Sequence, residues 1–172
     1  MSTNPTPSTT WRAELTAWLK ENKRTMPEDL RQLHQEFLRR FPREHLREMT
    51  LEEYALGHPK SRDSFCYWLE WQTEALGSVR GGTSAKWGVW WSQAENGWRA
   101  NAFLGDAETA MHTIRSVLAD MLDASAAGRF EELDRIGDKL GTNRNSLRSK
   151  TLFLYFPDEF LPIASPERIA LF

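Results

Sequence analysis

Residues 86–103 carry the pattern that most restricts the fold of this chain. Lys86 to Ser92 (KWGVWWS) is rich in aromatic and β-branched residues, Asn96-Gly97 is a turn signal, and Trp98 to Phe103 resumes the aromatic pattern. Two short β-prone segments joined by Asn-Gly are typical of a β-hairpin. We therefore predict an antiparallel hairpin over 86–103. It carries four of the eight tryptophans of the chain, namely Trp87, Trp90, Trp91 and Trp98.

The segments before the hairpin have helical spacing. Apolar residues recur every three or four positions between 27 and 41, which predicts an amphipathic helix. Thr50 and Glu53 have the spacing of a capping box, which predicts the start of a short helix. The apolar positions between 63 and 76 predict a further helix before the hairpin.

The segments after the hairpin predict two more helices and one strand. Asp106 is expected to cap the longest helix of the chain, and another helix is expected over 130–140. Residues 150–156 (KTLFLYF) place apolar side chains on both faces, which is typical of a central strand that is covered above and below. These elements predict an α+β fold. It has a helical N-terminal part and a small, mostly antiparallel sheet, made of hairpin 86–103 and strand 150–156 and packed with helices.

The chain divides into three expected parts. Residues 1–10 (MSTNPTPSTT) lack the basic start and the apolar run of a secretory signal, and their composition predicts a disordered leader. Residues 11–48 form an expected helical N-terminal extension, and residues 49–172 an expected α+β recognition domain. Because a helix opened by Ser165-Pro166 would stop at Phe172 in its first turns, we expect more protein to follow.

Cysteine usage and hydropathy indicate the compartment. Cys66 is the single cysteine, so no intrachain disulfide can form, and its apolar neighbours predict a small buried side chain. No apolar run reaches the ~18 residues that a membrane-spanning helix needs. With no export signal, these features predict a cytoplasmic protein without a membrane partner.

The distribution of charge is more informative than the net charge. A formal charge of −2 gives no global electrostatic case for binding nucleic acid. Two stretches, 76–94 and 141–156, contain cations but no acids, which predicts a local anion-binding face. The alternative is that both stretches are solvated loops. Their cations are Arg80, Lys86, Arg144, Arg148 and Lys150.

The common catalytic motifs are missing from the sequence. Residues 81–86 (GGTSAK) resemble a phosphate-binding loop in composition, but their order and spacing are wrong. The four histidines and the single cysteine lack the spacing of a zinc site, and no G-x-S-x-G elbow is present. A metal nuclease needs carboxylates and a lysine close together on strand ends, whereas the tripeptide Glu21-Asn22-Lys23 falls at an expected helix end with no strand nearby. We therefore expect no catalytic centre, no metal and no cofactor.

The hairpin combines aromatic rings with cations. Alternation places Trp87 and Trp91 on one face, and Lys86 and Arg99 lie in the same two strands. Rings of this kind can stack on nucleobases, at about 1–3 kcal/mol per base, while the cations hold phosphate. Because a sheet must also be covered, two or three of the tryptophans are expected in the core and one or two at a site. The expected stacking residues are Trp87, Trp91 and Trp98.

From Thr50 onward the sequence resembles an N-terminal domain of some bacterial McrB-type AAA+ proteins of modification-dependent (type IV) restriction systems. The resemblance lies in LEEYALG, DSFCYWLEW, ALGSVRGGTSAKWGVWWS, GRFEELD and LFLYFPDEFLPIASPE. It implies a nucleotide-hydrolysing AAA+ module after Phe172, a nuclease subunit in the complete system, and selection of marked nucleic acid by this domain. No Walker-type phosphate loop is present here, so it does not imply that this segment hydrolyses GTP or ATP.

Three functions follow from these observations. The leading hypothesis is a non-catalytic domain that recognises modified DNA, with RNA as the alternative nucleic acid. One alternative is a protein-interaction module that docks a partner subunit through exposed tryptophan and arginine. Another is a small-ligand sensor, which would need a closed aromatic pocket. In the leading hypothesis the phosphate contacts are Arg80, Lys86, Arg99, Arg144, Arg148 and Lys150.

Overall fold

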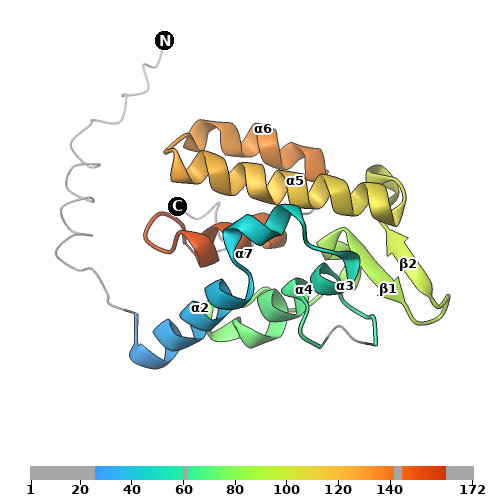
Figure 1. The fold of residues 1–172 in the computed structure, drawn as a ribbon, viewed down its shortest axis with the longest axis horizontal. Coiled ribbons are helices and arrows are strands. Elements are labelled where there is room, and N and C mark those ends of the chain that lie inside the picture. The colour runs from blue at the N-terminus through green and yellow to red at the C-terminus, as the bar shows by residue number, and fades with distance from the viewer. Residues whose placement is uncertain (1–25, 60–61, 142–144, 162–172) are drawn as a thin grey trace, which may run out of the picture.

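A computed structural model describes residues 26–59, 62–141 and 145–161 (Figure 1). Its longer helices are α2 (Glu28–Arg40), α5 (Ala107–Ala126) and α7 (Asn145–Tyr155). The shorter ones are α3 (Leu51–Tyr54), α4 (Phe65–Tyr67) and α6 (Leu133–Gly137). The hairpin is formed by β1 (Val89–Ser92) and β2 (Gly97–Ala100). The expected leader 1–10, Arg144 and the expected last helix lie outside the described residues.

Short turns of other helix types link these elements. A π-helical turn at Trp68–Gln72 follows α4 directly. The 3₁₀ turns are Arg43–Arg47, Glu74–Leu76, Ser84–Trp87, Ala102–Leu104, Phe130–Glu132 and Asp138–Leu140. The helix predicted over 63–76 is thus a chain of α, π and 3₁₀ turns, and the helix predicted over 130–140 combines α6 with a 3₁₀ turn on each side.

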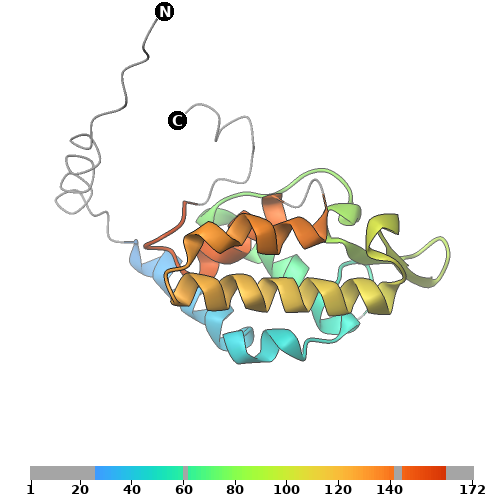
Figure 2. The ribbon, with the colours of Figure 1, turned by 90° about the horizontal axis from the view of Figure 1, so that it is seen from above.

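Helix α5 lies at the centre of the fold, and its ends are those predicted. Asp106 caps it, because its Oδ1 accepts a hydrogen bond of 2.8 Å from the Thr109 N–H. Gly128 follows its C-terminus with a φ of 70°, which only glycine adopts readily. The helix packs against α6, α7 and both strands of the hairpin (Figures 1 and 2).

The hairpin confirms the strongest local prediction, although it is shorter than 86–103. Trp91 pairs with Trp98 across the strands, and Asn96 takes a positive φ of 48° in the turn. Lys86 and Trp87 lie outside β1, in a 3₁₀ turn, because the chain bends at Gly88 with a φ of 91°. The α+β class is correct, with two strands in the sheet.

The predicted central strand 150–156 is wrong, because these residues lie in α7 and the turn after it. The helix packs against α2, α5 and the π-helical turn, so it is enclosed on several sides. Leu147, Thr151 and Leu154 are all nearly or fully buried. A helix covered in this way has apolar residues around much of its circumference, and over seven residues that pattern equals the pattern of a covered strand.

The described part of the N-terminal extension shares the core of the domain. Phe37 is fully buried in α2, and its ring lies 5.6 Å from Tyr155 and 5.8 Å from Phe65. The predicted capping box is present, because Thr50 Oγ1 accepts from the Glu53 N–H and the Glu53 side chain accepts from the Thr50 N–H. Cys66 is fully buried, as expected. Within the described ranges, no helix has the length and apolarity needed to cross a membrane.

Replacing Gly88 with alanine is expected to lower the free energy of unfolding by about 2 kcal/mol. The new Cβ would lie 2.7 Å from Ile114 Cδ1 and 3.2 Å from Leu104 Cδ1, in a backbone conformation with φ of +91°. Gly128→Ala is the matched control, since its φ is also positive (+70°) but its Cβ would meet no atom within 4 Å. Chemical denaturation of both variants measures the difference. An equal loss of unfolding free energy in the two variants would show that packing at Gly88 is not tight.

Candidate ligand-binding cleft

Trp87 is a core residue in this structure rather than a stacking platform. It has no exposed surface, and its Nε1 donates a hydrogen bond of 3.0 Å to Glu70 Oε2. Its carbonyl oxygen accepts a hydrogen bond of 2.6 Å from the Tyr54 hydroxyl. A base could not reach this ring, because none of its surface is exposed. The predicted stacking role of Trp87 therefore has no geometric basis.

Lys150 is likewise buried, with 1% of its surface exposed. Its Nζ donates hydrogen bonds to the carbonyl oxygens of Thr73 (2.7 Å) and Gly77 (2.5 Å), at the end of the helical segment 65–76. Burial lowers the pKa of Lys150 to about 8, because the interior disfavours the charged form. This lysine satisfies backbone carbonyls and cannot contact a phosphate, in contrast to the prediction.

Lys86 is held by a buried ion pair. Its Nζ lies 2.7 Å from Glu70 Oε1, and both side chains are at most 14% exposed. The same ammonium donates to the carbonyl oxygens of Val79 (2.9 Å) and Gly81 (2.8 Å) and lies over the Trp87 ring. With its charge balanced and its donors occupied, Lys86 is poorly placed to bind phosphate directly.

The three described arginines of the predicted site are each paired with an acid from another part of the sequence or from a neighbouring turn. Arg80 pairs with Glu74, Arg99 with Glu95, and Arg148 with Asp134. The first two pairs are about half exposed, and exposed pairs contribute about 0–1 kcal/mol. Phosphate can therefore compete for Arg80 and Arg99.

Trp91 and Trp98 pack against each other and against His58. The ring centroids of the two tryptophans lie 5.1 Å apart, and the His58 ring stacks on Trp98 at 5.4 Å. Both tryptophans are half-buried. The His58 ring covers one face of Trp98, and both tryptophans use part of their ring surface in packing within this cluster.

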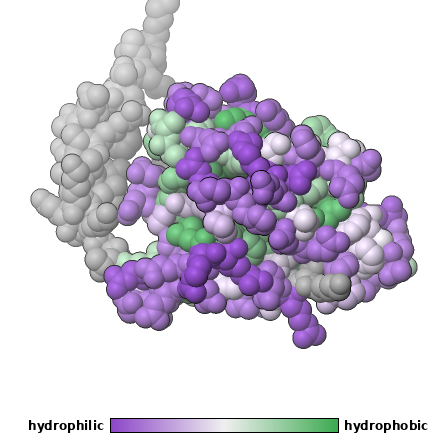
Figure 3. All heavy atoms as spheres, in the orientation of Figure 1, coloured by the Kyte–Doolittle hydropathy of each residue, from purple (hydrophilic) through white to green (hydrophobic). Residues whose placement is uncertain are grey.

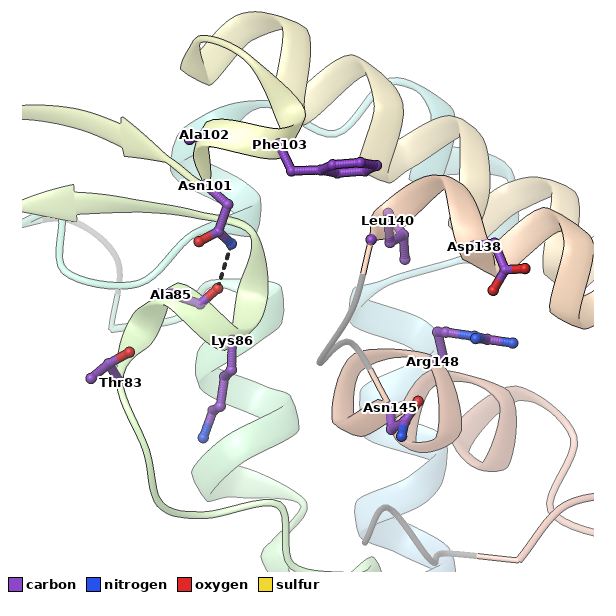
Figure 4. A pocket seen from close by; sticks show the side chains of 11 residues that line it. Thr83, Ala85, Lys86, Asn101, Ala102, Phe103, Asp138, Leu140, Asn145 and Arg148 are labelled. Carbon is purple, nitrogen blue, oxygen red and sulfur yellow. Dashed lines mark hydrogen bonds between the residues drawn. The ribbon is translucent and has the colours of Figure 1, made fainter. Parts of the chain in front are cut away.

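A cleft of about 890 Å³ lies between the base of the hairpin and the corner formed by α6 and α7 (Figure 4). The two acid-free stretches predicted from the sequence meet here. Thr83 and Lys86 come from the first stretch, and Asn145 and Arg148 come from the second. The cleft thus brings together two of the predicted site residues, Lys86 and Arg148, and the other described ones lie outside its lining.

Phe103 is the exposed aromatic residue of this cleft. It is 71% exposed and points across the opening toward the side formed by Leu140 (Figure 4). Its ring lies over Gly141, where an added Cβ would be 2.8 Å from Phe103 Cδ1. From the sequence, Phe103 was expected at the end of a strand, with no function assigned to it. No periodic signal could have singled it out, because a single exposed phenylalanine has no pattern.

Hydrogen bonds to neighbouring groups hold the side chains of Asn101 and Arg148 at the cleft. Asn101 Nδ2 donates to the Ala85 carbonyl at 2.8 Å, which fixes its carboxamide. Arg148 Nη2 donates to Asp134 Oδ1 at 2.8 Å and to the Leu133 carbonyl at 3.3 Å. Its guanidinium passes over Gly137, where a Cβ would come within 2.4 Å of the guanidinium carbon. The cleft therefore presents the restrained amide of Asn101 and guanidinium of Arg148, together with the Phe103 ring and the Asp138 carboxylate.

A second, smaller hollow of about 230 Å³ is lined by Arg43, Glu44, Arg47, Ala119 and Asp123. The face shown in Figure 3 is mostly hydrophilic, with small separate hydrophobic patches. In the described parts of the chain, no group of three or more His, Cys, Asp or Glu side chains is arranged to hold a metal ion. Comparison of the sequence with protein-family models and with curated proteins gives no match, and comparison of the fold with solved structures gives none.

Proposed function

We propose that this chain is a non-catalytic recognition domain that binds nucleic acid, and that the cleft holds the nucleotide. The observation that carries the proposal is the exposed ring of Phe103 at a cleft lined by Asn101, Asn145 and Arg148. The location differs from the one that the sequence suggested, the aromatic face of the hairpin, because Trp87, Trp91 and Trp98 use their rings in packing.

The size and chemistry of the cleft support this proposal. Ligand pockets commonly measure about 300–1,000 Å³, and a volume of about 890 Å³ accommodates a nucleotide. Phe103 supplies a face on which any base can stack. The carboxamides of Asn101 and Asn145 have both donors and acceptors, which suits them to the edge of a base. Arg148 also lines the cleft, but its guanidinium is held by Asp134 and by the Leu133 carbonyl, so we assign the base contacts to the two asparagines.

In this proposal the domain selects the target and other modules act on it. Aromatic, amide and guanidinium groups hold and read a ligand without transforming it. The resemblance to McrB-type proteins supplies the context, in which an AAA+ module and a nuclease subunit act on modified DNA in the cytoplasm. The chain described here would contribute the contact with the nucleic acid.

Phe103→Ala is expected to weaken binding of single-stranded DNA about tenfold, because one stacked base contributes about 1–3 kcal/mol. Fluorescence anisotropy with labelled single-stranded and duplex probes, unmodified and methylated, measures the affinity at two salt concentrations. Phe130→Ala is the matched control, since Phe130 is 45% exposed and lies outside the cleft. Its affinity should equal that of the wild-type chain.

Two results would contradict the proposal. One is the absence of binding to every probe at low salt. The other is equal weakening by Phe103→Ala and Phe130→Ala, which would place the contact outside the cleft. The first result would favour the protein-interaction module, for which capture of a defined partner subunit is the next measurement.

A further inference from the structure

The segment 77–83 at one edge of the cleft is held by side chains rather than by a helix or a sheet. The Lys86 ammonium donates to the carbonyl oxygens of Val79 and Gly81, at 2.9 Å and 2.8 Å. The same ammonium lies 2.7 Å from the carboxylate of Glu70. Two carbonyl groups of this segment therefore point inward, toward a fixed and charge-balanced lysine.

The inward Gly81 carbonyl determines where the N–H of the next residue points. In a trans peptide the C=O and N–H bonds point in opposite directions, and all described peptides are trans. The N–H of Gly82, which shares its peptide with the Gly81 carbonyl, therefore points away from Lys86. Gly82 is exposed, and a Cβ added there would meet no atom within 4 Å. Among the described residues its N–H has no acceptor, so it is an open donor.

Arg80 adds a cation to the same segment. Its guanidinium pairs with Glu74 at 2.9 Å, and the two side chains are 53% and 42% exposed. An exposed pair of this kind is weak and can be exchanged for a phosphate, which the guanidinium binds with two donors. Thr83, at the end of the segment, lines the cleft, so the segment that carries the two donors adjoins one edge of the cleft.

We propose that residues 80–83 form a phosphate-binding edge of the cleft, where the Gly82 N–H and the Arg80 guanidinium donate to a backbone phosphate. The inference rests on the proposed function, which supplies the nucleotide whose base packs on Phe103. Backbone N–H groups in glycine-rich turns are common donors to phosphate. Lys86 is a positioning residue in this arrangement, because it holds the carbonyls inward and its own charge is balanced by Glu70.

The test is an amide chemical-shift titration of the full chain with inorganic phosphate and, separately, with a thymidine oligonucleotide. Sodium chloride at equal ionic strength is the control. We expect saturable shifts of the Gly82 amide and its neighbours with both ligands and none with chloride. Since inorganic phosphate carries no base, this arm tests the edge independently of the cleft.

Two variants separate a phosphate contact from general electrostatics. Arg80→Gln is expected to weaken oligonucleotide binding about tenfold and to reduce the salt dependence by about one ion. Arg129→Gln is the matched control, because Arg129 is about equally exposed at 50%, also pairs with a glutamate, and does not line the cleft. It should bind like the wild-type chain.

A double variant tests the role of Lys86. Changing Lys86→Met alone would leave the Glu70 carboxylate buried without its cation, so Glu70→Gln is combined with it. The double variant is expected to retain the amide spectrum of the core and to lose the shift of Gly82 with phosphate. A folded double variant with an unchanged Gly82 response would contradict the positioning role.

The outcomes distinguish this inference from the proposed function. Oligonucleotide binding that depends on Phe103, with the Gly82 amide unmoved and Arg80→Gln neutral, would overturn the phosphate edge and leave the proposed function standing. A Gly82 shift with phosphate, together with no binding of the oligonucleotide, would overturn the proposed function and leave the phosphate contact standing. No shift with either ligand would overturn the edge.

Discussion

Replacing Trp87 with alanine is expected to lower the free energy of unfolding by about 3–5 kcal/mol. Trp87 has no exposed surface, so the substitution removes a complete aromatic ring from the core and leaves a cavity beside the hairpin. It also removes the indole N–H that donates to Glu70, one of the two partners of a buried carboxylate. Denaturant unfolding followed by circular dichroism measures the loss.

Trp98→Ala provides the comparison, because Trp98 lies on the same hairpin but is only half-buried. Its cost should be on the order of 1–2 kcal/mol. The account would be contradicted by a Trp87→Ala protein that is as stable as the wild-type chain and binds nucleic acid more weakly. That result would indicate that Trp87 contacts the nucleic acid and does not stabilise the core.

Stability is expected to rise with pH between about 8 and 10.5 because of Lys150. Burial lowers its pKa from 10.5 in the unfolded chain to about 8 in the folded one. Below pH 8 both states are protonated, and the folded state bears the full cost of burying the ammonium. Above pH 10.5 both states are neutral, so that cost is gone. Because each pKa unit corresponds to about 1.4 kcal/mol, the gain should approach about 3 kcal/mol.

The measurement is the difference in unfolding free energy between the wild-type chain and Lys150→Met across this pH range. Both proteins keep Tyr155, whose pKa burial raises well above its ordinary value. Its ionisation in the unfolded chain lowers stability above pH 10, and it cancels in the difference. The difference should therefore report Lys150 alone. Parallel stability curves for the two proteins would contradict the assignment.

The elements with local signals were predictable from the sequence. The Thr50–Glu53 capping box, the Asp106 N-cap and the Asn96-Gly97 turn each depend on residues within a few positions of one another. Local hydrogen bonds and backbone conformations of this kind require no knowledge of the rest of the chain. The hairpin and the longest helix were found for this reason.

The α7 segment was not predictable from periodicity. Whether KTLFLYF is a strand or a helix depends on what surrounds it, and here α2, α5 and the π-helical turn surround it. A short, mostly apolar segment fits either structure, and only its length would have separated them. The helix begins at Asn145, ahead of the predicted strand 150–156.

The burial and the ion-pair partners of the lysines also depended on long-range contacts. Lys86 pairs with Glu70, and Lys150 reaches the carbonyl of Thr73, which is distant in sequence. Counting acids within a stretch could not reveal these partners. The same count nevertheless identified two of the segments that line the cleft. Phe103 was assigned no function, because its position over Gly141 at the cleft depends on a contact between distant residues and leaves no local pattern in the sequence.

The most direct test of the central claim is photo-crosslinking of the intact chain to a thiothymidine-containing single-stranded oligonucleotide, with the crosslinked peptides identified by mass spectrometry. The account predicts crosslinks to the segments that line the cleft, first of all to the peptide that contains Asn101 and Phe103. Crosslinks confined to Trp91, Trp98 or Arg99 on the hairpin would contradict it, and so would the absence of any crosslink at concentrations where the probe is bound.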